Sequence, residues 1–148
     1  MPPPIEVVWF EVLNEIGIIN QLASTAFSRA LPHDLTIAQF TVLNHCVRLG
    51  DNWTPARLAA AFQITRGTLT ATLKRLEAKG FIALVPDTED GRSKRVHLTE
   101  EGRQAREDAI IETFPMLQTV SQALPAELAK SLIPNLRQLR IFLDENRS

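Results

Sequence analysis

The sequence predicts a mainly α-helical fold that carries one small β-hairpin. Apolar residues recur at spacings of three and four along most of the chain, which is the period of an amphipathic helix. Two short apolar runs, "FIALV" and "RVHL", flank the charged, glycine-containing stretch "PDTEDGRSK", a pattern typical of a hairpin. With 148 residues, the chain is long enough to bury a core, and we expect one domain over residues 1–148.

The first two helices are delimited by proline, threonine and glycine. Apolar side chains of residues 5–30 fall on one helical face without an internal proline, and Pro32 closes this long helix. In "LTIAQFTVLNHCVRLG", Thr36 is placed to cap a second helix, and Gln39, three residues later, completes a capping box. Gly50 then ends the second helix.

Two shorter helices follow, joined by a turn of about three residues, which is helix-turn-helix spacing. Thr54 caps the third helix, and Pro55 takes its first position, where a missing N–H costs little. Thr65 caps the fourth helix, which ends at Gly80 and points a stripe of leucines inward: Leu69, Leu73 and Leu76. Its outer face then holds only small, hydroxyl-bearing or basic residues: Gly67, Thr70, Ala71, Lys74 and Arg75.

The hairpin and two further helices complete the predicted fold. In "RVHL", two apolar residues alternate with an arginine and with His97, which gives the second strand one apolar and one polar, outward face. Thr99 caps a helix that we expect to run toward Leu124 with a kink at Pro115. A last helix starts near residue 125 and is expected to be interrupted by Pro134.

Charge is distributed unevenly although the net charge is only -1. Residues 65–98 carry seven basic and four acidic side chains, a balance of +3, whereas residues 1–50 and residues 99–148 each have a balance of -2. A basic segment in a nearly neutral chain indicates a local surface that faces a polyanion.

Composition also limits the location and the class of protein. No apolar run approaches the roughly 18 residues of a membrane span, and the N-terminus lacks a basic signal-peptide region, so we expect a cytoplasmic protein without a membrane partner. Cys46 is the only cysteine, which excludes an internal disulfide and a four-cysteine zinc site. Cys46 follows His45, but adjacent helical residues point about 100° apart. We therefore expect a buried structural cysteine, no metal site and no enzyme activity.

The central block offers the chemistry of a DNA-binding surface. A helix fits the major groove of DNA, and a basic hairpin tip can lie on the backbone or enter the minor groove. The candidate phosphate or base contacts are Arg66, Lys74, Arg75, Arg92, Lys94 and Arg95. Thr65, Thr68 and Thr70 are candidate hydroxyl donors, and Gly67 leaves room for close approach. Asp90 stands two residues before Arg92, so its carboxylate can brace the guanidinium in a tight turn.

Each of these features has a simpler interpretation when taken alone. A basic helix face is often only solvated, and a charged turn is often only a soluble hairpin. Their succession along the chain favours DNA binding. The alternative is a winged-helix module for protein or RNA contact, which predicts no sequence-specific duplex binding.

A family resemblance adds to this interpretation. The segment "LAAAFQITRGTLTATLKRLEAKGFIALVPDTEDGRSKRVHLTEEG", from Leu58 to Gly102, resembles the centre of the MarR family of winged helix-turn-helix regulators. The strongest match is "LEAKGFI" followed by "DGRSKRVHLTEEG", which is similar to the Asp-x-Arg wing and the Leu-Thr-x-x-Gly helix entry of that family. The chain departs from the family in Leu84 and Val85, where a basic residue is common, and in the prolines at 115 and 134.

The resemblance implies a fold and a mode of action. Residues 36–98 would form the winged helix-turn-helix lobe, and residues 1–31 and 99–148 would form the dimerisation helices of an obligate homodimer. The resemblance places DNA recognition on Thr65, Arg66, Gly67, Thr68, Thr70, Ala71, Lys74 and Arg75. It also places Arg92 in the minor groove, braced by Asp90. It further implies a repressor that needs no cofactor and responds to a small aromatic or anionic effector.

Overall fold

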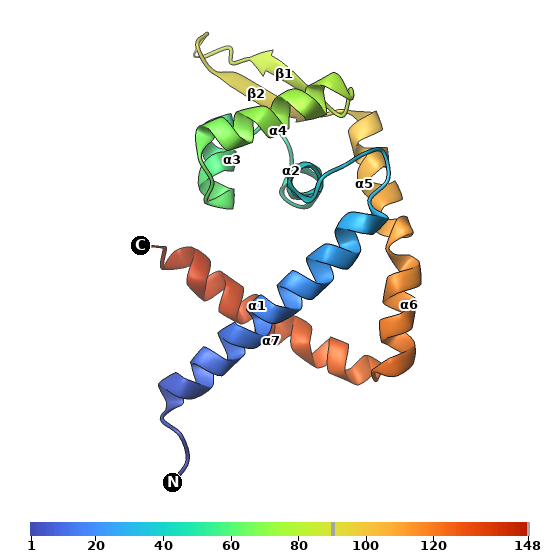
Figure 1. Ribbon diagram of the computed structural model, residues 1–148. Coiled ribbons are helices and arrows are strands. Elements are labelled where there is room, and N and C mark those ends of the chain that lie inside the picture. Colours follow the sequence, from blue (N-terminus) through green and yellow to red (C-terminus); the bar gives the residue numbers. More distant parts are fainter. Residues whose placement is uncertain (90, 148) are drawn as a thin grey trace. The chain divides into compact units, whose positions relative to one another are not determined.

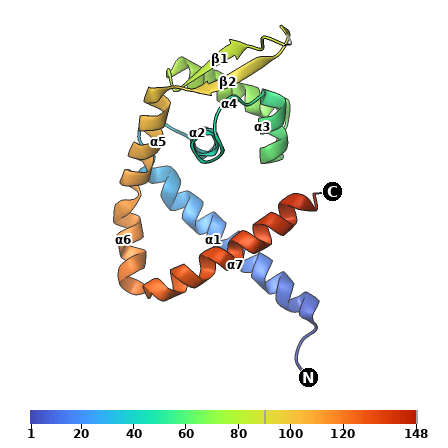
Figure 2. The same cartoon turned by 180° about the vertical axis from the view of Figure 1, so that it is seen from behind.

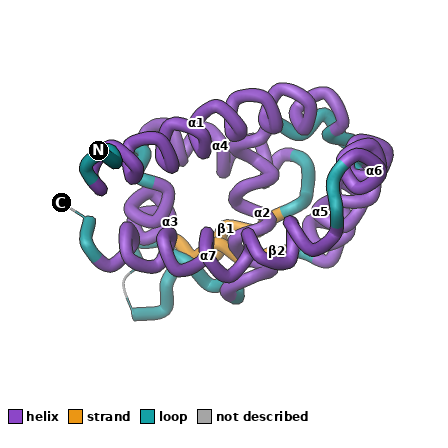
Figure 3. Tube along the Cα trace, turned by 90° about the horizontal axis from the view of Figure 1, so that it is seen from below, coloured by secondary structure: helices purple, strands orange, loops and turns teal. Residues whose placement is uncertain are grey.

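The computed structural model describes residues 1–89 and 91–147 and confirms a mainly helical fold with one hairpin (Figure 3). In this part of the chain the elements are α1 (Ile5–Ala30), α2 (Ile37–Leu49), α3 (Pro55–Phe62), α4 (Arg66–Ala78), β1 (Ile82–Pro86), β2 (Lys94–Leu98), α5 (Glu100–Glu112), α6 (Phe114–Ala123) and α7 (Ala126–Glu145). The order is the predicted one as far as the hairpin, but three helices follow the hairpin where two were expected. No helix among the described residues is long and apolar enough to cross a membrane.

Threonine caps define where four of these helices begin. At α2 the Thr36 side chain accepts a hydrogen bond from the Gln39 N–H at 3.1 Å, and the Gln39 side chain accepts one from the Thr36 N–H at 3.4 Å, which confirms the capping box. The same type of N-cap bond is made by Thr54 at α3, Thr65 at α4 and Thr99 at α5. Each cap satisfies a backbone donor that has no partner within the helix.

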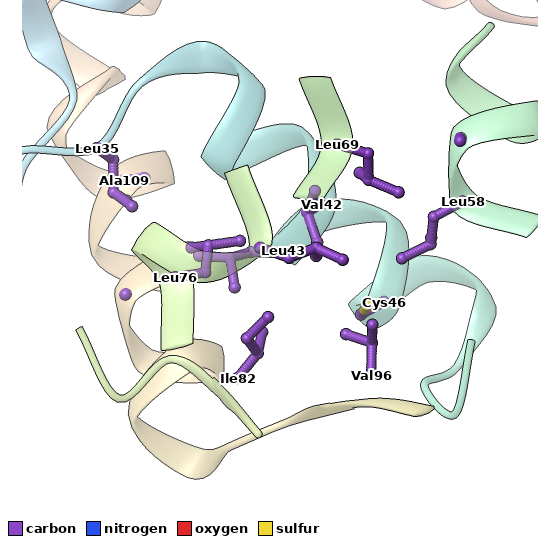
Figure 4. Close-up of a cluster of buried hydrophobic side chains, with 13 residues drawn as sticks. Leu35, Val42, Leu43, Cys46, Leu58, Leu69, Leu76, Ile82, Val96 and Ala109 are labelled. Carbon is purple, nitrogen blue, oxygen red and sulfur yellow. The ribbon is translucent and has the colours of Figure 1, made fainter. Parts of the chain in front are cut away.

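The core lies between α2, α3, α4, α5 and the hairpin. The three leucines of the predicted inward stripe of α4 are at most 2% exposed, and they pack with Val42 and Leu43 of α2. Figure 4 shows Leu76 and Leu69 of α4 pointing toward the α2 side chains, with Cys46 beside Val96 of β2. The recognition of this stripe from its spacing is therefore confirmed.

The hairpin is antiparallel, and its register runs from Ile82 opposite Leu98 to Pro86 opposite Lys94. Val96 faces the core and is fully buried. Trp53, in the segment before α3, forms an isolated antiparallel bridge with Val96 of β2. In this bridge the Val96 N–H donates to the Trp53 carbonyl at 2.8 Å. Figures 1 and 2 show α4 and the hairpin lying side by side in the lobe, with the hairpin tip projecting beyond the helix.

The chain divides into two compact units, Met1–Thr113 and Phe114–Ser148. The helix that was expected to continue from Thr99 toward Leu124 is in fact two helices, because α5 ends at Glu112 and α6 begins at Phe114. The proline at 115 accounts for the break, since its ring clashes with a helical carbonyl four residues earlier and it has no N–H to donate. α5 thus falls in the first unit, while the expected grouping of residues 99–148 for dimerisation stays a prediction.

The expected interruption of the last helix is wrong. α7 runs through Pro134 without a break from Ala126 to Glu145. Proline removes one backbone hydrogen bond, to the carbonyl of Lys130, but the remaining turns on both sides hold the helix. The loss of stability that Pro134 causes at one position was therefore not enough to end this helix of 20 residues.

Candidate nucleic-acid interface

The outer face of α4 brings the predicted contact residues together. All eight positions are exposed, and the buried leucines lie on the opposite face. The eight are Thr65, Arg66, Gly67, Thr68, Thr70, Ala71, Lys74 and Arg75. Residues three and four apart share a helix face, so Gly67, Thr70, Ala71, Lys74 and Arg75 lie on the outer side of α4, whereas Thr65, Arg66 and Thr68 lie around its N-terminal end. We call these eight exposed residues together the α4 face.

Two of the three candidate threonine hydroxyls of the α4 face already have acceptors within the chain. The Thr65 hydroxyl donates to the Thr68 hydroxyl oxygen at 2.8 Å, and the Thr70 hydroxyl donates to the Arg66 carbonyl at 2.7 Å. Donation from Thr65 or Thr70 to a phosphate therefore requires its hydroxyl to rotate away from these acceptors. The Thr68 hydroxyl accepts the bond from Thr65 and can donate its own proton without breaking that bond.

Four cations of this region are unpaired within the described chain. Arg66, Lys74, Arg75 and Lys94 are exposed, and none of the ion pairs among residues 1–89 and 91–147 includes them. Their charge is therefore not neutralised locally, as is needed for binding a polyanion.

The wing arginines differ from one another. Arg92 is exposed at the tip. Arg95 is turned inward: its Nε lies 3.2 Å from Asp87 Oδ2, and its Nη1 donates to the Asn52 carbonyl at 3.0 Å. Asp90, the predicted brace for Arg92, lies outside the described residues, so the brace stays a prediction.

A stacked pair at the start of α3 was not found by sequence reasoning. The guanidinium carbon of Arg57 lies 4.9 Å from the centre of the Trp53 ring. The Trp53 indole N–H donates to the Gly50 carbonyl at 2.6 Å, which fixes the ring. The signal in the sequence was an aromatic residue four positions before an arginine at a predicted helix start. Arg57 is exposed and lies in the same lobe as the α4 face.

His45 and Cys46 sit in the core rather than in a site. The His45 ring meets the rings of Trp53 and Phe62 edge-on at 4.7 and 5.0 Å, and its Nε2 is buried without a hydrogen bond in the described structure. Burial, and then the nearby Arg48 charge, lowers the pKa of His45. Burial, and then Asp51, raises the pKa of the Cys46 thiol to about 11. Cys46 is thus an inert core thiol, as predicted.

His97 was expected on the polar, outward face of the second strand of the hairpin. In the structure it is half-buried, and its Nδ1 lies 3.4 Å from Asp51 Oδ2. No group of three or more histidine, cysteine, aspartate or glutamate side chains in the described residues could hold a metal ion.

The C-terminal end of α4 is anchored to the connection between α1 and α2. The Lys79 ammonium donates to the Asp34 carbonyl at 2.7 Å and to Gln39 Oε1 at 2.8 Å. The neighbouring His33 ring nitrogen lies 2.7 Å from Asp108 of α5. Hydrogen bonds from Gln104 and then from His33 lower the pKa of Asp108. The position of α4 therefore depends on contacts at both of its ends.

A small apolar cavity of about 210 Å³ lies within the lobe. It is lined by Ala38, Thr41, Val42, Phe62, Ile64, Leu69 and Thr72. No charged side chain lines it. The cavity therefore suits a neutral apolar group better than an anion.

The sequence is similar to those of known transcriptional regulators. A model of the MarR family matches residues 33–93, which run from just before α2 through β1 to the residue before β2. The multiple antibiotic resistance protein MarR of Escherichia coli (strain K12) is 36% identical over 118 residues, covering 79% of this chain and 76% of that protein. An HTH-type transcriptional regulator of Bacillus cereus is 33% identical over 106 residues, covering 72% of this chain and 67% of that protein.

The fold is similar to solved structures of the same kind. The crystal structure of wild-type MarR from E. coli in its apo form has a TM-score of 0.73 at 27% identity and covers 94% of this chain and 98% of that chain. A mutant MarR from E. coli, crystallised with operator DNA, has a TM-score of 0.70 at 29% identity and covers 90% of this chain and 95% of that chain. The similarity extends over the lobe and the terminal helices.

Proposed function

Because the chain belongs to the MarR family of transcriptional regulators, we propose that it represses transcription as a ligand-responsive homodimer that binds a pseudo-palindromic operator. Its relatives are transcriptional regulators rather than enzymes. The observation that carries the proposal is the exposed, cationic α4 face lying beside a projecting hairpin (Figure 1).

DNA recognition is proposed to use both elements of the lobe. α4 enters the major groove, where its side chains reach base edges and phosphates. The hairpin lies along the neighbouring minor groove with Arg92 at its tip, braced by Asp90. Lys94 contacts the backbone, whereas Arg95 contributes to DNA binding chiefly by holding the start of the hairpin turn through Asp87. A relative, MarR from E. coli, has been crystallised with operator DNA.

Homodimer formation is supported by the exposed apolar residues of the terminal helices. α1, α6 and α7 each have no buried residue in the isolated chain. Large apolar side chains exposed on them include Trp9, Phe10, Ile19, Leu22, Phe114, Ile133 and Phe142. Soluble proteins rarely leave such faces open to water. In a two-fold dimer the two α4 helices would meet half-sites about one helical turn of DNA apart.

Ligand response is proposed to act on the position of α4. In the homodimer, the two winged helix-turn-helix lobes would adopt one arrangement that binds DNA and another that does not. A small aromatic or anionic effector would bind the second arrangement better and so shift the population away from the DNA-binding state. This step is supported by the two hydrogen bonds through which Lys79 ties the C-terminal end of α4 to the connection between α1 and α2. No cofactor is required by this scheme.

The test is a selection from sheared host DNA. The purified protein is incubated with the fragments at near-physiological salt, and the bound fragments are recovered and sequenced. Enrichment of one short pseudo-palindrome is expected. If fragments from all parts of the genome are recovered equally, with and without added small aromatic or anionic compounds, sequence-specific binding is contradicted. The protein- or RNA-contact module would then be favoured.

A further inference from the structure

We propose that Arg57, held in place by the Trp53 ring, is an additional DNA-phosphate contact that lies outside the α4 face and the wing tip. The inference rests on the proposed DNA-binding function and adds a positioned cation from α3.

Trp53 is fixed by three kinds of contact. Its indole N–H donates to the Gly50 carbonyl at 2.6 Å. Its main chain is paired with β2, because the Trp53 carbonyl accepts from the Val96 N–H at 2.8 Å. Its ring meets the half-buried His45 ring at 4.7 Å. Two contacts of the ring and one of the main chain therefore limit the movement of the surface against which Arg57 packs.

Arg57 lies over this ring and keeps its charge available. The guanidinium carbon is 4.9 Å from the ring centre, within the range of a cation–π contact. The residue is exposed, and no ion pair among residues 1–89 and 91–147 involves it. Stacking occupies a face of the guanidinium and leaves the N–H groups at its edge able to bind oxygen. A preoriented arginine also loses less conformational entropy when it binds a phosphate.

The position of α3 indicates which part of DNA Arg57 would meet. α3 and α4 are the two helices of the helix-turn-helix, and when the second enters the major groove the first crosses the DNA backbone. Arg57 is in the first turn of α3, and Trp53, two residues before that helix, is paired with β2. The cation thus lies at the start of the first helix of the helix-turn-helix, over a residue that is paired with the wing strand.

The contrast with Arg95 strengthens the assignment. Arg95 was the candidate cation of β2, but its guanidinium is held by Asp87 and by the Asn52 carbonyl. Asn52 is the residue before Trp53. Two adjacent residues thus treat their arginines differently: Asn52 binds Arg95 within the protein, whereas Trp53 supports Arg57 at the surface.

The main test measures operator affinity of Arg57→Gln between 50 and 200 mM salt. Loss of one phosphate contact lowers the slope of log K against log salt by about 0.9. The affinity ratio of wild type to variant should then shrink about threefold over this range. Arg103→Gln is the matched control, since Arg103 is an exposed arginine on α5 outside the proposed contacts; it should leave the slope unchanged.

Two further variants separate charge from orientation. Arg57→Lys keeps the charge but loses the planar stacking group, so it should restore the salt slope without restoring the full affinity. Trp53→Phe should weaken operator binding in the wild-type background and have no further effect in the Arg57→Gln background. The melting temperature of each variant, measured in parallel, identifies any loss that arises from misfolding.

The outcomes distinguish this inference from the proposed function. If wild type selects an operator but Arg57→Gln matches it in affinity and salt slope, the phosphate contact is wrong and the DNA-binding function stands. An equal effect of Trp53→Phe in both backgrounds would overturn the positioning role of the ring. If wild type selects no operator at any condition, the proposed function itself fails, and this inference fails with it.

Discussion

At the scale of single residues, the junction between β2 and α5 explains the threonine and glycine of "LTEEG". The Thr99 hydroxyl donates to the Gly80 carbonyl at 2.6 Å, and the Thr99 N–H donates to the Phe81 carbonyl at 3.2 Å. A Cβ on Gly102 would lie 1.9 Å from that same Phe81 carbonyl oxygen. Only glycine lets the first turn of α5 come this close to the main chain of Phe81, between α4 and β1.

Gly102→Ala is therefore expected to destabilise the fold. The added methyl group must displace main chain, which we expect to cost about 1–3 kcal/mol of unfolding free energy. Gly67→Ala is the control: nothing lies within 4 Å of its added Cβ, and alanine favours a helix by up to about 1 kcal/mol. Urea unfolding of both variants checks this, and equal stability of the two would contradict the close approach.

Arg92→Ala is expected to weaken operator binding without unfolding the protein. Because Arg92 is proposed to enter the minor groove, the loss should be about 1–3 kcal/mol of binding free energy. The melting temperature should stay the same. Unchanged binding, measured by fluorescence anisotropy with the selected operator, would show that the wing assignment is wrong.

His45 makes stability depend on pH. Its pKa is lowered in the folded state, so the unfolded chain binds the proton more readily. The stabilising effect of neutral His45 is complete above its ordinary pKa of about 6.5 and is lost as the pH falls below that value. The slope is at most about 1.4 kcal/mol per pH unit and is smaller here because the ring is only half-buried.

The measurement is urea unfolding of wild type and His45→Gln from pH 8 to pH 5. The difference in unfolding free energy between them should shift in favour of the variant as the pH falls. A constant difference across this range would mean that His45 is equally easy to protonate in both states.

At the scale of elements, α4 is fixed at both ends while its outer face stays open. Thr65 caps its first turn, and Lys79 just beyond its last turn binds the Asp34 carbonyl and Gln39. The hairpin beside it is joined by Trp53 to the start of α3. These connections hold the helix and wing in one arrangement, which lowers the ordering cost of binding DNA.

Lys74→Ala is expected to reduce affinity by a similar factor for every DNA sequence. Lys74 lies on the α4 face without an ion-pair partner among the described residues, so we assign it to phosphate. The slope of log K against log salt should fall by about 0.9, whereas Lys130→Ala on α7 should leave it unchanged. An effect limited to one operator position would instead assign Lys74 to base recognition.

At the scale of the whole molecule, the described chain leaves its terminal helices incompletely buried. The lobe has a closed core, but α1, α6 and α7 keep apolar side chains such as Phe10 and Phe142 more than half exposed. Burial of apolar area yields roughly 25 cal/mol per Å². A second copy of the chain that covers these helices would therefore add much of the stability of the assembly.

We expect a homodimer whose melting temperature rises with protein concentration. Phe142→Asp should shift sedimentation toward the monomer and lower the melting temperature, because it would bury an unpaired charge in the interface. Leu49→Asp is the control, since Leu49 is similarly exposed but lies at the end of α2 in the lobe. A monomeric wild type at micromolar concentration would contradict the dimer.

Features that depend on neighbours within a few residues could be predicted from the amino-acid sequence. The threonine caps at 36, 54, 65 and 99 and the stripe of leucines on α4 were predicted correctly, because capping and helical periodicity act within one or two turns. The exposed α4 face followed directly from that stripe. The effect of proline was predicted less reliably: a helix ended shortly before Pro115, but another helix continued through Pro134.

Contacts between side chains that are far apart in the sequence could be identified only from the tertiary structure. Arg95 binds the Asn52 carbonyl 43 positions away, and Lys79 binds the Asp34 carbonyl 45 positions away. The Trp53 bridge to β2 and the approach of Gly102 to Phe81 have the same origin. Such contacts leave no periodic pattern in the sequence, because they arise only when packing of the core has fixed where the chain segments lie.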